Sequence, residues 1–274
     1  MNIKKIFSYK LDEFRYAKET NNLIDFIMSN KSKEGRRIFY EKYKRRGVDM
    51  CLSMGLKVPA DFPIDSLNEV FFEKIYDVIG YIPKATDIVI DVGAHTGDWT
   101  VYCAKVLNVK NIYAFEPLKD NIKHAKSILD LNDCNNSHLY EIGLSNSDKE
   151  IEIEYDGNMM GKLCTNKNPK KESIMFKRLD SFDLYCDILK IDVEGFELEV
   201  LNGAIETIKK FRPRIILEVH SKKLRSECNK ILEQEGYKLD IIGRKAKKNT
   251  ADKHSSFDEV VNLFYSYKLN KSNS

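Results

Sequence analysis

The stretch DIVIDVGAHTG, residues 87–97, predicts a buried strand that turns through glycines into a helix. Its β-branched run, Ile88 to Ile90, is typical of a central strand that is covered on both faces. Gly93 and Gly97 permit turn dihedral angles that other residues rarely adopt, and they let a ligand approach the backbone closely. We therefore expect a ligand-binding loop at the carboxyl end of a central strand.

Apolar strands and amphipathic helices alternate from about residue 86 onward. Strand-like runs cover residues 111–117, 138–145, 187–195 and 214–220, and helical patterns cover 98–108, 119–132, 196–204 and 222–236. This alternation predicts an α/β fold with a Rossmann-like, doubly wound, mostly parallel sheet that has helices on both faces. The last two strands, 237–243 and 260–267, leave no room for a helix between them. We therefore expect the last strand to be antiparallel.

The first 80 residues follow a helical pattern instead. We divide the chain into an N-terminal helical extension (1–80), a Rossmann-like domain (81–268) and a polar tail (269–274). An amphipathic extension needs a surface to cover, so we expect it to cap the active site or to mediate self-association, which makes a homo-oligomer an expected state.

The charge is uneven, although the net charge is only +3. Residues 1–47 hold 13 Lys and Arg against 6 Asp and Glu, and basic clusters lie at 42–47 and 243–249. These clusters either face an anionic partner or are simply solvated. They lack the interleaved aromatic residues of a nucleic-acid platform, so no nucleic-acid partner is expected.

The composition also bears on the compartment. No apolar run approaches the roughly 20 residues of a transmembrane helix, and Asp12 and Glu13 interrupt the segment where a signal peptide would be apolar. The six cysteines are scattered, without a Cys-x-x-Cys pair. Scattered thiols are typical of a reducing compartment, so a cytoplasmic location is predicted.

The loop after the first strand narrows the choice of cofactor. A nicotinamide dinucleotide favours G-x-G-x-x-G, but the middle glycine is absent here, and no Gly-Lys-Ser/Thr of a Walker loop is present. Asp91 suits a ligand that carries an ammonium group. Glu116, at the end of the next strand, is placed to accept hydrogen bonds from a ribose diol. An ammonium group, a ribose and close backbone approach together describe S-adenosylmethionine.

Five motifs resemble the FkbM family of methyltransferases. They are IDVGAHTG, AFEP, GLSNSDKEIEI, RLDSF and the pair LKIDVEGFELEVLNGA with RPRIILEVH, in this order over about residues 86–220. The resemblance implies S-adenosylmethionine-dependent O-methylation of a hydroxyl, often on a sugar, a glycan or a secondary metabolite. It implies cofactor contacts at Asp91, Gly93, Ala94, His95, Thr96, Gly97, Glu116, Pro117, Leu144 and Ser145. His95 departs from the family loop, where asparagine is common.

Acid–base candidates gather at the ends of two later strands. Lys190, Asp192 and Glu194 alternate with apolar residues, so a strand would point all three to one face. Glu218 and His220 end another strand. An imidazole titrates near pH 6.5, which favours His220 as the base and Asp192 as the group that positions the hydroxyl.

Simpler interpretations of these residues remain open. Lys190 would then neutralise Asp192, Glu194 would interact with a helix N-terminus, and His220 would be an ordinary loop histidine. Glu197 and Glu199, on the following helix, are expected to be solvated. A further alternative is a divalent ion such as Mg²⁺, held by Asp192, Glu194 and Glu218.

Two other classes of function also stay open. One is a catalytically silent binding module that keeps the cofactor fold, and the other is an NAD-dependent oxidoreductase. The expected acceptor is a small molecule or a glycan, either anionic or lipid-linked, and the residues do not identify it further.

Overall fold

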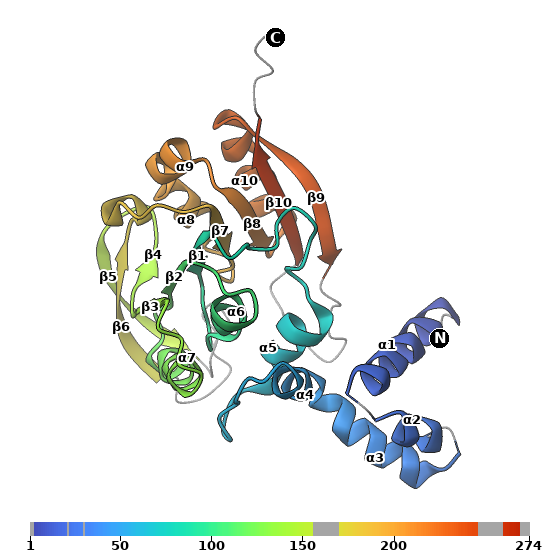
Figure 1. Cartoon of the computed structure of the whole chain (residues 1–274). Coiled ribbons are helices and arrows are strands. Elements are labelled where there is room, and N and C mark those ends of the chain that lie inside the picture. The colour runs from blue at the N-terminus through green and yellow to red at the C-terminus, as the bar shows by residue number, and fades with distance from the viewer. Residues whose placement is uncertain (1–2, 21, 30, 156–169, 246–259, 269–274) are drawn as a thin grey trace. The chain divides into compact units, whose positions relative to one another are not determined.

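The computed structural model describes residues 3–20, 22–29, 31–155, 170–245 and 260–268 (Figure 1). The chain forms two compact units, residues 1–74 and 75–274. Within the described ranges, none of the helices combines the length and the apolar character that crossing a membrane requires.

The first unit is helical. Its elements are α1 (Ile3–Glu19), α2 (Leu23–Ser29), α3 (Lys33–Lys44), α4 (Arg46–Ser53), α5 (Ile64–Leu67) and the π-helix η1 (Asn68–Glu73). Tyr16 and Phe39 are fully buried, and Phe72 contacts the Tyr16 ring edge to face at 6.2 Å. Arg36 forms two hydrogen bonds to the buried carboxylate of Glu13. This unit therefore has a small aromatic core of its own.

The second unit is built on a seven-stranded sheet in the order β3-β2-β1-β7-β8-β10-β9. The strands are β1 (Ile88–Val92), β2 (Asn111–Phe115), β3 (Ser137–Tyr140), β7 (Ile188–Ile191), β8 (Arg214–Val219), β9 (Tyr237–Lys245) and β10 (Val261–Tyr267). Neighbouring strands run parallel, except that β10 is antiparallel to both β8 and β9. The predicted fold class, including the antiparallel last strand, is confirmed.

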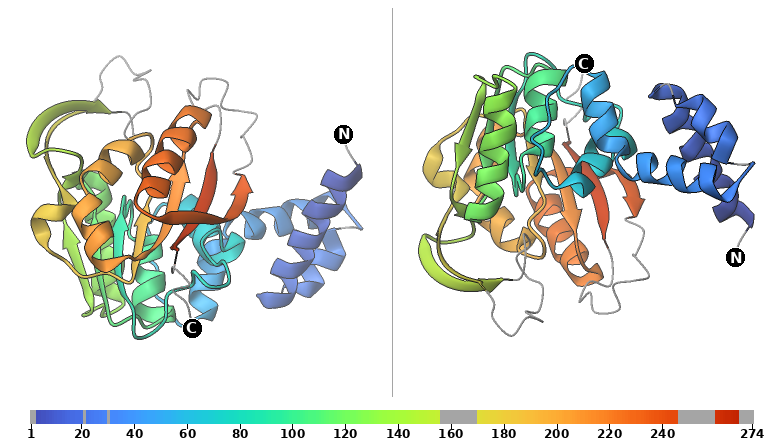
Figure 2. Two further views of the ribbon diagram at one scale, coloured as in Figure 1. Left: turned by 90° about the horizontal axis from the view of Figure 1, so that it is seen from above. Right: turned by 90° about the horizontal axis from the view of Figure 1, so that it is seen from below.

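Helices cover both faces of this sheet (Figure 2). One face carries α6 (Asp98–Val101), the π-helix η2 (Tyr102–Val106) and α7 (Lys119–Leu131). The other carries α8 (Glu197–Asn202), α9 (Ile205–Phe211) and α10 (Lys222–Gln234). Alternate residues of the central strands, such as Ile90, Leu189 and Leu217, are buried in the core on the α8–α10 side. Their sequence neighbours therefore project toward the α6 side.

A small second sheet follows β3. It consists of β4 (Gly143–Leu144), β5 (Lys149–Tyr155) and β6 (Lys170–Lys177), and it precedes the 3₁₀ turn η3 (Leu179–Phe182). The single strand predicted for residues 138–145 is therefore wrong, because the chain leaves the main sheet after Tyr140 and re-forms as β4 in the second sheet.

Candidate functional site

Packing within the protein requires glycine at two positions of the loop after β1. Gly93 and Gly97 both have left-handed backbones, with φ of 79° and 82°. A Cβ at Gly93 would overlap the carbonyl oxygen of Asp192, and a Cβ at Gly97 would lie 2.9 Å from Cα of Ala125 on α7. The sequence-based reason that the turn needs glycine dihedral angles is confirmed, and packing within the protein is a second reason that the sequence does not show. The glycines allow β1, the loop after β7 and α7 to approach one another.

This loop is tied to the end of β2 by hydrogen bonds. The amides of Gly93 and Ala94 both donate to the carbonyl of Phe115, at 3.0 Å each. The His95 amide donates to Oε2 of Glu116 at 2.9 Å, and His95 itself has a φ of 50°. Thr96 is fully buried. The loop is thus held in place by β2 and by the carboxylate that follows it.

Glu116 lies at the carboxyl end of β2, as the sequence predicts. It is 5% exposed, and its Oε1 accepts hydrogen bonds from the Leu118 amide and the Asn121 side chain, each at 3.0 Å. Burial raises the pKa of the Glu116 carboxyl, and these donors oppose the rise. A carboxylate has about four acceptor positions, and three are used by His95, Leu118 and Asn121. Roughly one remains for a ligand hydroxyl.

A narrow apolar pocket lies beside Glu116, at the carboxyl ends of β1 and β2. It is lined by Val92, Gly93, Phe115, Pro117, Ile142, Gly143, Leu144, Phe176, Val193 and Phe196. The predicted residues Pro117 and Leu144 are among them, whereas Ser145 is buried and does not line it. Sequence reasoning missed Phe176 and Phe196. The pocket is therefore apolar and lies next to a buried carboxylate.

Asp91 and Lys190 form an ion pair under this loop. The Lys190 ammonium lies 3.1 Å from Oδ1 of Asp91 and donates to the Gly93 carbonyl at 3.0 Å. Thr100 donates to the other oxygen of Asp91 at 2.7 Å. Asp91 is fully buried, so the ammonium beside its carboxylate in this structure is that of Lys190 rather than a ligand's. Lys190 lies farther from Asp192, at 3.8 Å.

The pKa of Lys190 excludes it as a proton acceptor at neutral pH. Burial works against the charged ammonium, but the charges of Asp91, Asp192 and Asp98 outweigh it and raise the pKa of Lys190. Lys190 therefore remains an ammonium that connects β7 to the glycine loop.

Asp192 is held by a residue that no pattern in the sequence indicates. The hydroxyl of Tyr76 donates to Oδ2 of Asp192 at 2.8 Å. The Tyr76 ring is 6% exposed and contacts Trp99 edge to face at 5.7 Å. Tyr76 precedes Asp192 by 116 residues and belongs to no motif. Tyr76 and Asp192 therefore come into contact only in the folded protein.

Glu194 does not share a strand face with Lys190 and Asp192, contrary to the prediction. β7 ends at Ile191, and Glu194 lies in the following turn with a left-handed backbone, φ 54°. The two-residue alternation of a strand therefore does not extend to Glu194.

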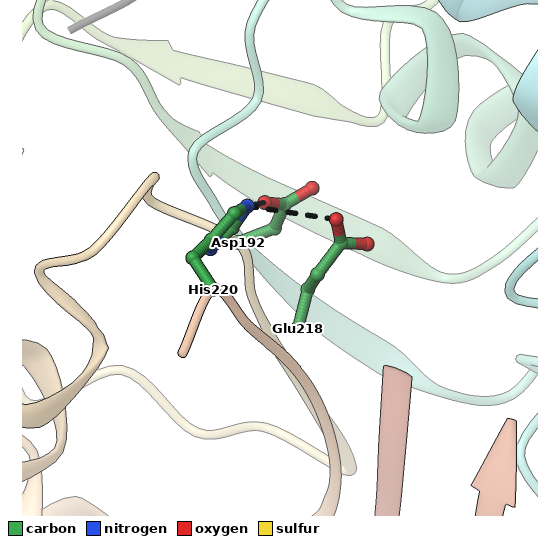
Figure 3. A group of neighbouring side chains, drawn as sticks. All are labelled: Asp192, Glu218 and His220. Atoms are coloured by element: carbon green, nitrogen blue, oxygen red, sulfur yellow. Dashed lines mark ion pairs between the residues drawn. The ribbon is translucent and has the colours of Figure 1, made fainter. Parts of the chain in front are cut away.

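Asp192, Glu218 and His220 come together at the ends of β7 and β8 (Figure 3). Nε2 of His220 lies 3.6 Å from Oε1 of Glu218 and 3.9 Å from Oδ1 of Asp192. His220 is 3% exposed, and Asp192 and Glu218 are half-buried. The structure thus brings together three of the residues that the sequence singled out.

The other side of the His220 ring contacts Glu197, which the sequence led us to expect in solvent. That expectation is wrong: Glu197 is fully buried, and its Oε1 lies 2.8 Å from Nδ1 of His220. The Gly195 amide donates to the same oxygen at 2.9 Å. The sequence pattern does not distinguish Glu197 from Glu199. Glu197 is the one that is buried beside His220, because α8 packs near β8.

The neighbouring carboxylates change the expected charge of His220. Burial disfavours the imidazolium, but the hydrogen bond to Glu197 and the charges of Asp192 and Glu218 raise the pKa of His220 to about 9. The neutral imidazole expected from the sequence is therefore not the form that this site favours at pH 7.

Comparison with known proteins identifies the family. The model of the methyltransferase FkbM domain matches residues 91–260. Methyltransferase 1 of Beauveria bassiana is 22% identical over 202 residues, which span 64% of this chain and 80% of that protein. Hexuronic acid methyltransferase AglP of Haloferax volcanii is 26% identical over 196 residues, which span 66% of this chain and 79% of that protein.

A solved structure is also similar. It is that of methyltransferase FkbM from Methylobacillus flagellatus KT, with a TM-score of 0.48 and 17% identity, covering 80% of this chain and 59% of the other. The match to the family domain extends over more than half of the chain, from Asp91 at the end of β1 past Glu218 and His220. The chain therefore belongs to the FkbM methyltransferase family, as its sequence motifs predicted.

Proposed function

We propose that the protein transfers the methyl group of S-adenosylmethionine to a hydroxyl group of a sugar, a glycan or a secondary metabolite. One observation carries this proposal. The cluster of Asp192, Glu218 and His220 lies at the same strand ends of one sheet as the glycine loop and the apolar pocket beside Glu116. Ligands of doubly wound sheets bind at the carboxyl ends of the strands, where all these groups are found.

The cofactor would be held by the segments that follow β1 and β2 and by residues of β4 and β6. Glu116 would accept a hydrogen bond from the ribose, and Pro117, Leu144 and Phe176 would enclose the adenine. The loop from Gly93 to Gly97 would lie along the methionine end. When bound, the cofactor supplies a methyl group on a positively charged sulfur. The protein therefore has only to align an acceptor oxygen with that methyl and help remove its proton.

The acceptor side of the site suits a hydroxyl. Asp192, fixed by Tyr76, would accept a hydrogen bond from the acceptor and orient its oxygen. We assign removal of the hydroxyl proton to Asp192, Glu218 and His220 as a group. A sugar or glycan acceptor is supported by the likeness to a protein named hexuronic acid methyltransferase.

Transfer of label from methyl-labelled S-adenosylmethionine tests this proposal. Acceptors would be glycans that contain hexuronic acids and fractions of the source extract. We expect His220→Ala to lower turnover by about 10²- to 10⁴-fold, the usual cost of losing an acid–base group, with S-adenosylhomocysteine affinity nearly unchanged. Glu227→Gln, on the outer surface of α10, is the control and should turn over normally. Wild-type turnover in His220→Ala would refute the assignment of the cluster.

A further inference from the structure

The geometry of the Asp192–Glu218–His220 cluster matches the spacing of metal ligands. One candidate ligand atom from each side chain lies within 4.8 Å of the other two, and the two distances from Nε2 of His220 are 3.6 and 3.9 Å. Ligand atoms about 2.1 Å from a common six-coordinate ion lie about 3.0 to 4.2 Å apart. Both distances from Nε2 of His220 lie in this range.

His220 is held as metal-binding histidines usually are. Its Nδ1 hydrogen-bonds to Glu197, so that Nε2 faces Asp192 and Glu218 (Figure 3). A carboxylate behind the imidazole fixes the ring and strengthens the other nitrogen as a ligand. Glu197 is in turn held by the Gly195 amide. Glu197 thus holds the imidazole with Nε2 directed toward Asp192 and Glu218, whether or not an ion is bound.

An independent observation comes from Asn262 on β10. Asn262 is the register partner of Glu218, so their side chains project from the same face of the sheet. Asn262 is 4% exposed, and its buried Oδ1 has no hydrogen-bond partner among the residues that the structure describes. A buried carbonyl oxygen without a donor is costly, and a cation beside Glu218 would satisfy it.

The charges nearby favour a cation at the same place. Lys190, the buried ammonium of this face, lies closer to Asp91 than to Asp192, at 3.1 against 3.8 Å. Three carboxylates, those of Asp192, Glu197 and Glu218, lie around the one imidazole of His220. Among the side chains that the structure describes at this cluster, negative charge therefore exceeds positive charge.

We propose that Asp192, Glu218 and His220, with the amide oxygen of Asn262, bind a divalent cation of the Mg²⁺ or Mn²⁺ class. Oxygen-rich ligand sets with one imidazole suit these ions. The metal site considered from the sequence had Glu194 as its third ligand. In this proposal His220 is the third ligand instead, because Glu194 lies in a turn beyond the strand.

The ion's role rests on the proposed function. It would bind the acceptor hydroxyl and make it more acidic. The new carbon–oxygen bond would form as the methyl carbon leaves the sulfur with its bonding electron pair remaining there, and the hydroxyl proton would pass to a carboxylate of the cluster and from there to water. Metal binding itself requires neither cofactor nor acceptor, so it can be tested separately.

Titration of the full chain with Mn²⁺, followed by the electron paramagnetic resonance signal of the free ion, tests the site. We expect one Mn²⁺ per chain, displaced by Mg²⁺, and affinity reduced at least tenfold in Glu218→Gln and in His220→Asn. Asn262→Leu should weaken binding several-fold, and Glu227→Gln should bind as the wild type does. Retained circular dichroism shows that each variant is folded.

Two results would overturn the metal site. One is that the wild type binds no Mn²⁺ at millimolar concentration, and the other is that both Glu218→Gln and His220→Asn bind it unchanged. If methyl transfer also persists after treatment with a chelator, the metal site fails while the proposed function stands. If Mn²⁺ binds but S-adenosylhomocysteine does not, the proposed function fails while the metal site stands.

Discussion

Buried carboxylates in the second unit differ in what surrounds them. Asp91 contacts an ammonium and a hydroxyl, Glu116 accepts from two backbone amides and an asparagine, and Glu197 contacts an imidazole. Each contacts a different kind of group, so each should respond differently to mutation. Under the proposed function, a change at Glu116 should act on cofactor binding, whereas a change near Asp192 should act on the acceptor.

Glu116→Ala should weaken S-adenosylhomocysteine binding by roughly ten- to a hundredfold. A hydrogen bond to a charged group contributes about 1.5–3 kcal/mol, and the variant also releases the amides of His95 and Leu118. Calorimetry measures the affinity. Glu141→Gln, an exposed carboxylate just after β3, is the matched control and should bind normally. An unchanged affinity in Glu116→Ala would remove Glu116 from the cofactor site.

Tyr76→Phe should lower kcat by about tenfold and leave S-adenosylhomocysteine binding nearly unchanged. The variant keeps the buried ring against Trp99 but loses the hydrogen bond that fixes Asp192. Tyr76 is thus a positioning residue rather than a catalytic one. Steady-state kinetics separates kcat from KM, and a wild-type kcat would show that Asp192 needs no such support.

At the scale of elements, the site is assembled by the loops that follow β1, β2, β7 and β8. Gly93 allows the loop after β1 to contact the loop after β7, because the absence of a Cβ leaves room for the Asp192 carbonyl. Lys190 ties the same two segments together through the Gly93 carbonyl. The positions of the cofactor-side and acceptor-side groups therefore depend on one close backbone approach.

Gly93→Ala should destabilise the protein more than Gly80→Ala does. Both glycines have positive φ, 79° and 89°, so both variants incur about 1–2 kcal/mol of backbone strain. A Cβ at Gly80 meets open space, whereas a Cβ at Gly93 overlaps the Asp192 carbonyl, which adds about 1–3 kcal/mol. Urea denaturation measures both free energies of unfolding. Equal losses would show that the loop relaxes freely.

Much of this arrangement can be predicted from the sequence, because the periods of strand and helix are local. The run 88–92 and the alternation after it are sufficient to predict the sheet, and Asp192, Glu218 and His220 follow as residues at strand ends. The rest depends on tertiary packing. Tyr76 reaches Asp192 from 116 residues away, and Glu197 is buried only because α8 packs near β8.

At the scale of the whole molecule, the helical unit leaves many apolar side chains in solvent. Several large apolar side chains of α1 to α3 are exposed: Leu11, Phe14, Leu23, Ile24, Ile27, Met28, Ile38 and Tyr40. Of these, Phe14 also contacts Phe26, whose ring packs on Phe39 in the aromatic core. Exposed apolar groups in this number are typical of an interaction surface.

The double variant Ile24→Ser/Ile27→Ser should shift the protein toward the monomer, since self-association through this unit would cover both side chains. Ile24 is 78% exposed and Ile27 is 47% exposed. Sedimentation velocity at several concentrations measures the change. Ile79→Ser, at a site that is 90% exposed in the second unit, is the control. A wild type that sediments as a monomer at all concentrations would contradict self-association.

We propose that the chain binds S-adenosylmethionine along its glycine loop and beside Glu116. Calorimetric titration of the wild-type protein with S-adenosylhomocysteine, and in parallel with NAD, tests it most directly. We predict one S-adenosylhomocysteine per chain and no heat from NAD, because the loop lacks the middle glycine of a dinucleotide site. Binding of NAD without binding of S-adenosylhomocysteine would contradict the account.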